Sequence, residues 1–253
     1  MELGGAVAIV TGGGTGVGRA VSEKLAGAGA RAVVVNYSRS QSDAEETAQA
    51  LAAVGCEGVP FRATVADDVQ VRAMVDATVS RFGRLDVLVN NAGTTRFIAH
   101  PDLEALTEDV WDDVLGVNLK GTFYCSRAAA PALKEARGAI VNIASVAGLR
   151  ATGSSIVYGV SKAGVIQLTR NLAVALAPEV RVNVVAPGLI ATRWFRIPFG
   201  DEATDQQERQ VASTTPLQRV TTPQDIAQAV MGFLGSDMVT GQCVVVDGGR
   251  SVT

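Results

Sequence analysis

The chain has 253 residues, of which 47% are hydrophobic and 19% charged, the composition of a folded globular protein and not of a disordered one. Its net charge of −3 offers no basic field for nucleic acid or an anionic membrane. One histidine and three widely separated cysteines predict neither a metal site nor a disulfide framework. Because the start is not signal-like and no apolar run reaches about 18 residues, we expect a cytoplasmic protein without a membrane span.

Short apolar runs alternate along the chain with longer stretches whose apolar residues recur at helical spacing. The runs lack polar alternation, which is typical of strands buried on both faces of a parallel sheet. We therefore predict one α/β domain over residues 1–253, a doubly wound, seven-stranded parallel sheet with helices on both faces. The predicted strands are Ala6–Thr11, Ala32–Asn36, Glu57–Phe61, Val87–Asn90, Ala139–Ala144, Val180–Val185 and Cys243–Val246. The predicted helices are Val17–Ala28, Asp43–Val54, Asp67–Phe82, Thr107–Glu135, Ser155–Ala177 and Pro223–Leu234.

Residues 193–216 interrupt this alternation between the sixth strand and the last helix. They contain Trp194, Phe195 and Phe199, followed by the polar run Asp201–Gln210. Insertions of this length in a compact domain are commonly lids, so we expect a substrate lid here. The alternative is a surface excursion that packs its own aromatic side chains.

A glycine-rich turn follows the first predicted strand and opens the first predicted helix. Gly12, Gly16 and Gly18 give the spacing Gly-x3-Gly-x-Gly. The N-terminus of a helix binds phosphate, and glycines let the main chain approach a pyrophosphate. The placement predicts a dinucleotide site, although a plain strand-to-helix turn also explains glycines here. The expected contacts are Gly12, Gly14, Thr15, Gly16, Val17 and Gly18.

The end of the second strand predicts which dinucleotide is bound. In many dinucleotide folds an acid about 20 residues beyond the glycines binds the ribose 2′-OH, whereas here the end of the second strand is followed by no acid until Asp43. Ser38 and Arg39 can instead pair with a 2′-phosphate. We therefore expect NADP (NADPH) in preference to NAD, with Asn36, Ser38 and Arg39 in the cofactor site. The alternative for Arg39 is an ordinary solvated charge.

Tyr158 and Lys162 lie four residues apart, so they share one face of a predicted helix. A free phenol has a pKa of about 10, and a nearby ammonium lowers that pKa. The pair therefore predicts a tunable acid–base group. Ser145 follows a predicted strand, where residues line the ligand crevice of a parallel sheet, and its hydroxyl can hold a carbonyl oxygen beside Tyr158.

Taken together, these motifs resemble the classical short-chain dehydrogenase/reductase family over nearly the whole chain, and most of all the 3-oxoacyl-carrier-protein reductases and related carbonyl reductases. The resemblance implies a Rossmann-type fold and NADP(H)-dependent hydride transfer to or from a small-molecule carbonyl or secondary alcohol. The motifs are Thr11-Gly12-x3-Gly16-x-Gly18, Asn90-Asn91-Ala92-Gly93, Asn118, Ser145, Tyr158-x3-Lys162 and Pro187-Gly188.

The same resemblance implies roles for individual residues. Tyr158 would give and take the proton, Lys162 would bind the nicotinamide ribose, and Ser145 would polarise the carbonyl. Asn118 would hold a water that links Lys162 to solvent, although it can also be explained as a helix cap. Further cofactor contacts would be Thr64 and Val65 at adenine, Asn91, Ala92 and Gly93 at the adenosine ribose, and Pro187, Gly188, Ile190 and Thr192 at nicotinamide.

Three features depart from the family pattern. Many members carry Asp where Thr64 stands, and many NADP-preferring members carry Lys or Arg where Thr15 stands, which leaves Arg39 as the main phosphate anchor. The basic residues that would dock an acidic carrier protein have no clean match; Arg137, Arg170 and Arg181 are candidates, so carrier-protein docking stays open.

The substrate pocket is expected to be mixed in character. Arg96 and Arg150 either meet an anionic group of the substrate or lie at the surface as solvated charges. The expected lining is Thr94, Arg96, Val146, Leu149, Arg150, Ile156, Leu189 and Trp194.

Two further expectations concern assembly and class. The strand Cys243–Val246 should be an edge strand, and the helix Ser155–Ala177 is more apolar than one sheet face requires, so we expect a homotetramer unless these side chains pack internally. The functional alternatives are an NAD-dependent alcohol or sugar dehydrogenase, an epimerase or dehydratase that keeps its nucleotide, and a non-catalytic nucleotide-sensing protein.

Overall fold

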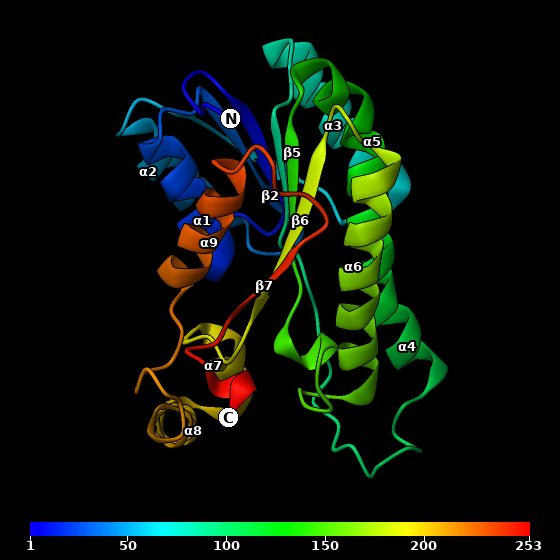
Figure 1. Ribbon diagram of the computed structural model, residues 1–253, viewed down its shortest axis with the longest axis vertical. Helices are drawn as coiled ribbons and strands as arrows, with labels where there is room; N and C mark the ends of the chain where they lie inside the picture. Colours follow the sequence, from blue (N-terminus) through cyan, green and yellow to red (C-terminus); the bar gives the residue numbers. More distant parts are fainter.

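The computed structural model describes the main chain of residues 1–253 and all side chains except those of Arg193 and Phe195 (Figure 1). Seven strands form one parallel sheet in the order β3-β2-β1-β4-β5-β6-β7, which confirms the predicted fold class. The strands are β1 (Val7–Val10), β2 (Ala32–Tyr37), β3 (Glu57–Arg62), β4 (Val87–Asn90), β5 (Ala139–Ile143), β6 (Arg181–Pro187) and β7 (Cys243–Val246).

Helices cover both faces of the sheet. Figure 1 shows α1, α2 and α9 on one side and α3, α5 and α6 on the other. The helices are α1 (Gly16–Gly27), α2 (Gln41–Ala52), α3 (Asp68–Phe82), α4 (Glu108–Leu115), α5 (Gly121–Ala136), α6 (Ile156–Ala175), α7 (Arg193–Phe199), α8 (Asp201–Ser213) and α9 (Pro223–Leu234).

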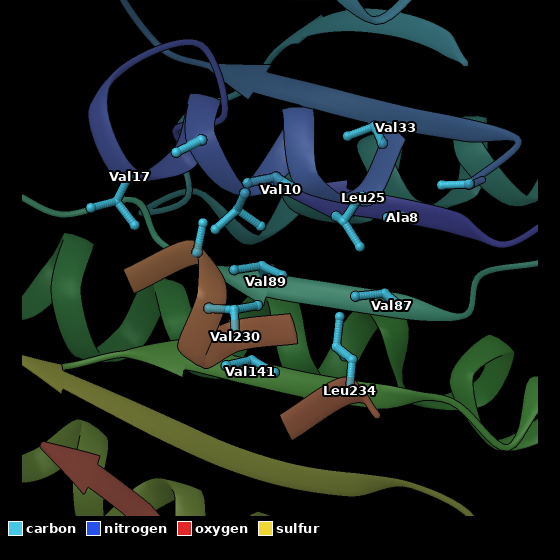
Figure 2. Close-up of a cluster of buried hydrophobic side chains, with 14 of the residues drawn as sticks. Ala8, Val10, Val17, Leu25, Val33, Val87, Val89, Val141, Val230 and Leu234 are labelled. Atoms are coloured by element: carbon cyan, nitrogen blue, oxygen red, sulfur yellow. The ribbon is translucent and has the colours of Figure 1, made fainter. Parts of the chain in front are cut away.

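The central strands are buried on both faces, which explains their unbroken apolar sequence. In β1, Ala8 and Val10 belong to the core beneath α1 and α9, whereas Val7 and Ile9 belong to the core beneath α3, α5 and α6. Figure 2 shows the first of these cores, with Val10 and the side chains of neighbouring strands packed against both covering helices.

The two edge strands differ from the central ones. β3 was expected to be buried on both faces, and this was wrong: its residues are exposed or half-buried, because it pairs on one side only and ends the sheet. At the opposite edge β7 lies where the sequence predicted an edge strand, and Val244 and Val245 of that strand are exposed.

The long predicted helix Thr107–Glu135 is divided into α4 and α5 by a π-helical turn, Gly116–Lys120. A π-turn inserts one extra residue into a helix and is frequent at functional sites. Here it carries Asn118, whose side chain is buried.

Residues 193–216, expected as a lid or surface excursion, form two helices and a connection. Arg196 of α7 makes ion pairs with Asp201, Asp205 and Glu208 of α8, which hold the two helices together. The ring of Phe199 meets Phe97 edge to face at a centroid separation of 4.8 Å. This contact joins the helical pair to the loop after β4. The side chain of Phe195, which was expected to belong to the same segment, lies outside the described part of the structure.

Candidate active site

The sheet order reverses between β1 and β4, so the loops after these strands diverge and leave a crevice at the carboxyl edge of the sheet. The glycine turn follows β1 directly, and Asn91 follows β4. Chain order alone therefore brings most of the predicted site residues to one edge.

The glycine turn requires its glycines for geometric reasons. Gly12 and Gly16 have φ of +60° and +50°, the left-handed region that favours glycine. A Cβ on Gly18 would lie 2.1 Å from the carbonyl oxygen of Gly12, so α1 packs directly on the turn. Thr15 precedes α1 without a side-chain cap bond, and no acid occupies its first turn. The N–H groups at the start of α1 therefore suit an anion.

Gly14 and Val17 are explained by packing. A Cβ on Gly14 would lie 2.8 Å from the main chain of Ala44, so this glycine lets α2 approach the turn. Val17 is buried in the core. Neither position needs a ligand to account for it.

Two asparagines hold the turn in place. Asn36 is buried; its side-chain oxygen accepts from the N–H of Gly12 (3.3 Å), and its NH₂ donates to the carbonyls of Phe61 and Ala63. Asn91 donates to the carbonyls of Thr11 (2.9 Å) and Gly12. Because the Asn36 side chain bonds three main-chain groups, the structure gives it a positioning role.

The Thr11 hydroxyl completes this brace. It accepts from the N–H groups of Asn91 (2.9 Å) and Ala92 (3.0 Å), which fixes the start of the loop after β4 against the glycine turn.

The predicted adenosine end is open to solvent. Ser38 and Arg39 are exposed just beyond β2, and Arg39 forms no ion pair with any side chain that the structure describes. The N–H of Thr64 donates to Gln70, whereas Val65 is buried against Gly121, so Val65 offers a ligand its main chain and not its side chain.

Tyr158, Lys162 and Ser145 come together. Tyr158 and Lys162 lie on α6, whose first turn is capped by Ser155 through the N–H of Tyr158. The Lys162 Nζ is 5.7 Å from the Tyr158 ring centroid and donates to the carbonyl of Ile143 at 3.0 Å. The Ser145 hydroxyl is hydrogen-bonded to Tyr158 and accepts from the N–H of Ala147 at 3.2 Å.

Burial has the largest influence on the pKa values of Lys162 and Tyr158. It lowers the pKa of Lys162 from 10.5 to about 8, because the ammonium is removed from water. It also raises the pKa of Tyr158, against which the hydrogen bond with Ser145 acts in the lowering direction. The net shift of the Tyr158 pKa is therefore upward, opposite to the depression that the sequence predicted. The reason is that loss of hydration outweighs the other influences on the phenol.

Asn118 is not a helix cap, because it lies inside the π-turn and not at the start of a helix. Its oxygen accepts from the N–H of Thr94 (2.8 Å), and its NH₂ donates to the Thr94 carbonyl (3.0 Å) and the Ser161 hydroxyl (2.9 Å). A Cβ on Gly93 would lie 3.4 Å from the Asn118 oxygen and 3.7 Å from the Lys162 Nζ. Asn118 and Lys162 therefore flank the same glycine.

The segment after β6 lies across from the glycine turn. A Cβ on Gly16 would lie 3.6 Å from the Thr192 methyl group. Ile190 forms a β-bridge with Thr221, and the Thr192 hydroxyl accepts from the N–H of Trp194 to start α7. Pro187 ends β6, and Gly188 packs against Asp247. The structure therefore brings Gly16, a predicted pyrophosphate contact, close to Thr192, a predicted nicotinamide contact.

The predicted substrate residues divide into two groups. Val146, Arg150 and Leu189 line a cavity of about 660 Å³ next to Ser145. Arg96 instead forms an ion pair with Asp113 (2.8 Å), which neutralises its charge. Thr94 is bound by Asn118, Ile156 is half-buried, and Leu149 and Trp194 are exposed at 47% and 38%.

The cavity residues that come from the C-terminal segment were not predicted from the sequence. The available signal was the run Asp247-Gly248-Gly249, which is typical of a tight turn, but nothing in it indicates which loops it meets. These residues are Asp247, Arg250, Ser251 and Thr253.

The described part of the structure holds neither a cluster of metal ligands nor a helix that could span a membrane. No three His, Cys, Asp or Glu side chains within it gather as metal ligands would. None of its helices has the length and apolar character needed to cross a membrane.

The fold and the gathered side chains define a nucleotide-binding oxidoreductase. A family model described as enoyl-(acyl carrier protein) reductase matches residues 12–251, and the chain belongs to the short-chain dehydrogenase/reductase family. It is 46% identical over 249 residues to the granaticin polyketide synthase putative ketoacyl reductase 2 of Streptomyces violaceoruber, covering 96% of this chain and 95% of that protein.

Two further comparisons agree with this assignment. A 3-oxoacyl-[acyl-carrier-protein] reductase FabG of Staphylococcus aureus (strain Mu50) is 41% identical, with 96% of each chain covered. The crystal structure of a putative short-chain dehydrogenase/reductase from Burkholderia xenovorans superposes with a TM-score of 0.91 at 32% identity, covering 98% of both chains.

Proposed function

We propose that this protein is an NADPH-dependent reductase of a ketone, acting between a carbonyl and a secondary alcohol, with Tyr158 as its acid–base group. The observation that carries the proposal is the meeting of Ser145, Tyr158 and Lys162 at the crevice edge. The ketoacyl reductases among the similar proteins favour a 3-oxoacyl or related keto substrate.

The residues fit a dinucleotide. The first turn of α1 offers N–H groups free of a side-chain cap and of acids, and such N–H groups bind phosphate. Lys162 has three donors, of which one binds Ile143, so two remain for ribose hydroxyls. When bound, the nicotinamide supplies the hydride.

The proton chemistry follows from the chain's own groups. Ser145 accepts its main-chain bond, which leaves its O–H to donate to a carbonyl oxygen placed beside Tyr158. That oxygen receives the phenol proton as negative charge develops on it. The buried Lys162 ammonium stabilises the resulting phenolate and, through a water held near Asn118, returns a proton to Tyr158.

Preference for NADPH is assigned to Arg39. Its guanidinium is exposed and has no acidic partner within the described part of the chain, and β2 ends in Asn36 and Tyr37 without a carboxylate that would repel a 2′-phosphate. Arg39→Ala is expected to weaken NADPH binding about 10–100-fold and NADH binding little. Equal losses for the two cofactors, measured by fluorescence titration, would assign the preference elsewhere.

Residues 193–216 are proposed as the substrate lid. The Phe97–Phe199 contact joins this segment to the loop that follows Asn91–Gly93, so movement of α7 and α8 opens or covers the crevice. Phe199→Ala should raise the KM for an apolar ketone, with unchanged NADPH affinity.

A homotetramer is proposed from the exposed edge of β7, where Val244 and Val245 face solvent in one subunit. Val165 and Ala173 of α6, and Leu176 directly after it, are buried inside the subunit, so that helix supports the proposal less than its sequence indicated. Light scattering at micromolar concentration tests it; an active monomer would contradict it.

The test of the central proposal is Tyr158→Phe assayed with NADPH and a panel of ketones. Loss of about 10²–10⁴-fold in kcat is expected, with NADPH still bound. Tyr124→Phe, a half-buried tyrosine on α5 away from the crevice, is the matched control and should keep full activity. Activity of Tyr158→Phe within about threefold of the wild type would reject the assignment. A wild type that binds nucleotide without turnover would favour a nucleotide-sensing role.

A further inference from the structure

The cavity beside Ser145 has the size of a ligand site. Its volume is about 660 Å³, and small-molecule pockets span about 300–1,000 Å³. Four segments far apart in sequence form it: the stretch after β5 that includes Val146 and Arg150, Gly188 and Leu189 after β6, the stretch from the end of α8 to Thr221, and the C-terminal turn from Asp247. One lining residue, Val146, directly follows Ser145 in the chain, so this wall of the cavity continues from the segment that carries Ser145.

The C-terminal wall of the cavity is rigidly built. Both oxygens of Asp247 accept main-chain bonds, from Gly249 at 2.9 Å and Ser251 at 2.7 Å. Gly248 has φ of +69°, and a Cβ there would lie 2.5 Å from the Thr215 methyl group. The turn therefore seats against the segment after α8, and this fixes Arg250 at the cavity wall.

Some charged side chains of the cavity lining have an oppositely charged partner, and others do not. Arg219 makes a two-bond ion pair with Asp225, at 2.5 and 2.8 Å, and this holds the pKa of Asp225 well below its usual range. Asp247 is occupied by the main chain. Arg150 donates to the main-chain carbonyl of Arg250 at 3.3 Å, which joins the two residues. Neither Arg150 nor Arg250 has an acidic partner among the side chains that the structure describes.

We propose that this cavity binds an anionic group, a carboxylate or a phosphate, carried by the keto substrate at a distance from the carbonyl, and that Arg150 and Arg250 recognise it. Guanidinium groups bind both anions through paired N–H donors. The inference rests on the proposed ketone reduction and adds a substrate class to it. Arg96 is not assigned this role, because it is already paired with Asp113.

The experiment compares ketones that differ only in charge. One pair is a keto acid with a terminal carboxylate and its methyl ester; the other is a keto alcohol and its phosphate monoester. For wild type, kcat/KM for the anion is expected to exceed that for its neutral counterpart about 10-fold, mainly through KM. Comparing the two pairs shows which anion is preferred.

The variants are Arg150→Gln, Arg250→Gln and both together. Each should reduce the preference, and the double variant should bring the ratio to about one. The control is Arg209→Gln, an exposed arginine of α8 outside the cavity lining, which should keep the wild-type ratio. Wild-type affinity for NADPH and an unchanged circular dichroism spectrum show that each variant is folded. Turnover of the neutral ester by the wild type and by Arg209→Gln shows that the reductase activity stands.

A wild type that reduces acid and ester equally, or a double variant that keeps the wild-type ratio, would overturn the inference and leave the proposed reductase intact. Calorimetric titration with the hydroxy acid product gives a readout independent of turnover. The double variant should bind it about 10-fold more weakly than wild type does, and unchanged binding would also overturn the inference.

Discussion

Lys162 is a buried charge that lowers the free energy of unfolding, and it also lies in the candidate active site. Its replacement tests both effects. The buried ammonium has a pKa of about 8 instead of 10.5, a difference equivalent to about 3 kcal/mol. At neutral pH the folded protein therefore holds a charge that it stabilises less well than water does. Lys162→Met keeps an unbranched side chain of similar length and removes the charge.

The expected gain is smaller than the full penalty. Lys162 donates to the Ile143 carbonyl, and losing that bond costs about 1 kcal/mol. We therefore expect Lys162→Met to raise the free energy of unfolding at pH 7 by about 2 kcal/mol and to abolish turnover, a trade of activity for stability.

The pH dependence of the free energy of unfolding gives an independent check on the direction of this effect. Below pH 8 both folded and unfolded wild type bind the Lys162 proton, so the penalty is constant. Between about pH 8 and 10.5 the unfolded chain binds more protons, so wild-type stability rises relative to that of Lys162→Met, and the gap closes.

Urea denaturation of both proteins between pH 7 and 10 measures the difference directly. Lys134→Met, at an exposed position of α5, is the control and should stay within about 0.5 kcal/mol of the wild type. A Lys162→Met variant less stable than wild type at pH 7, or a gap that does not change between pH 7 and 10, would refute the reasoning.

Two further substitutions test the scaffold of the site. Asn118→Ala removes the hydrogen bonds to Thr94 and Ser161, so it should lower kcat and lower the free energy of unfolding in urea by about 3 kcal/mol. The control Asn171→Ala, at an exposed position, should change neither quantity much. An unaffected kcat in Asn118→Ala would limit Asn118 to a structural role. Gly18→Ala, whose Cβ would lie 2.1 Å from a carbonyl oxygen, should lose NADPH binding and stability in titration and melting experiments. Gly27→Ala in the same helix has nothing within 4 Å of its Cβ and should be neutral or stabilising; similar losses in both variants would contradict the steric argument.

Local and periodic features of the site could be predicted from the sequence. The unbroken apolar runs indicated strands buried on both faces, and the four-residue spacing of Tyr158 and Lys162 placed them on one helix face. The glycine turn was recognisable because positive φ and close main-chain approach both require glycine. Such features depend on residues that are close neighbours in the chain, and the sequence itself lists those neighbours.

Only the tertiary structure decided the features that depend on distant partners. The π-turn at Asn118 was hidden because an inserted residue leaves helical periodicity nearly unchanged, and its contacts with Thr94 and Ser161 lie 24 and 43 residues away. The protonation of Tyr158 and Lys162 is governed by burial, which motif spacing does not report.

The pairing of charges at the crevice also could not be predicted from the sequence. Arg96 and Arg150 looked alike in the sequence, yet one is neutralised by Asp113 and the other meets Arg250, 100 residues away. The alternation of apolar runs with helical stretches determined the class of fold, and the order of the strands in the sheet determined where the crevice lies. Which arginine keeps its charge available depends on which side chains the folded loops bring within a few ångströms, because ion pairing weakens steeply with distance in water.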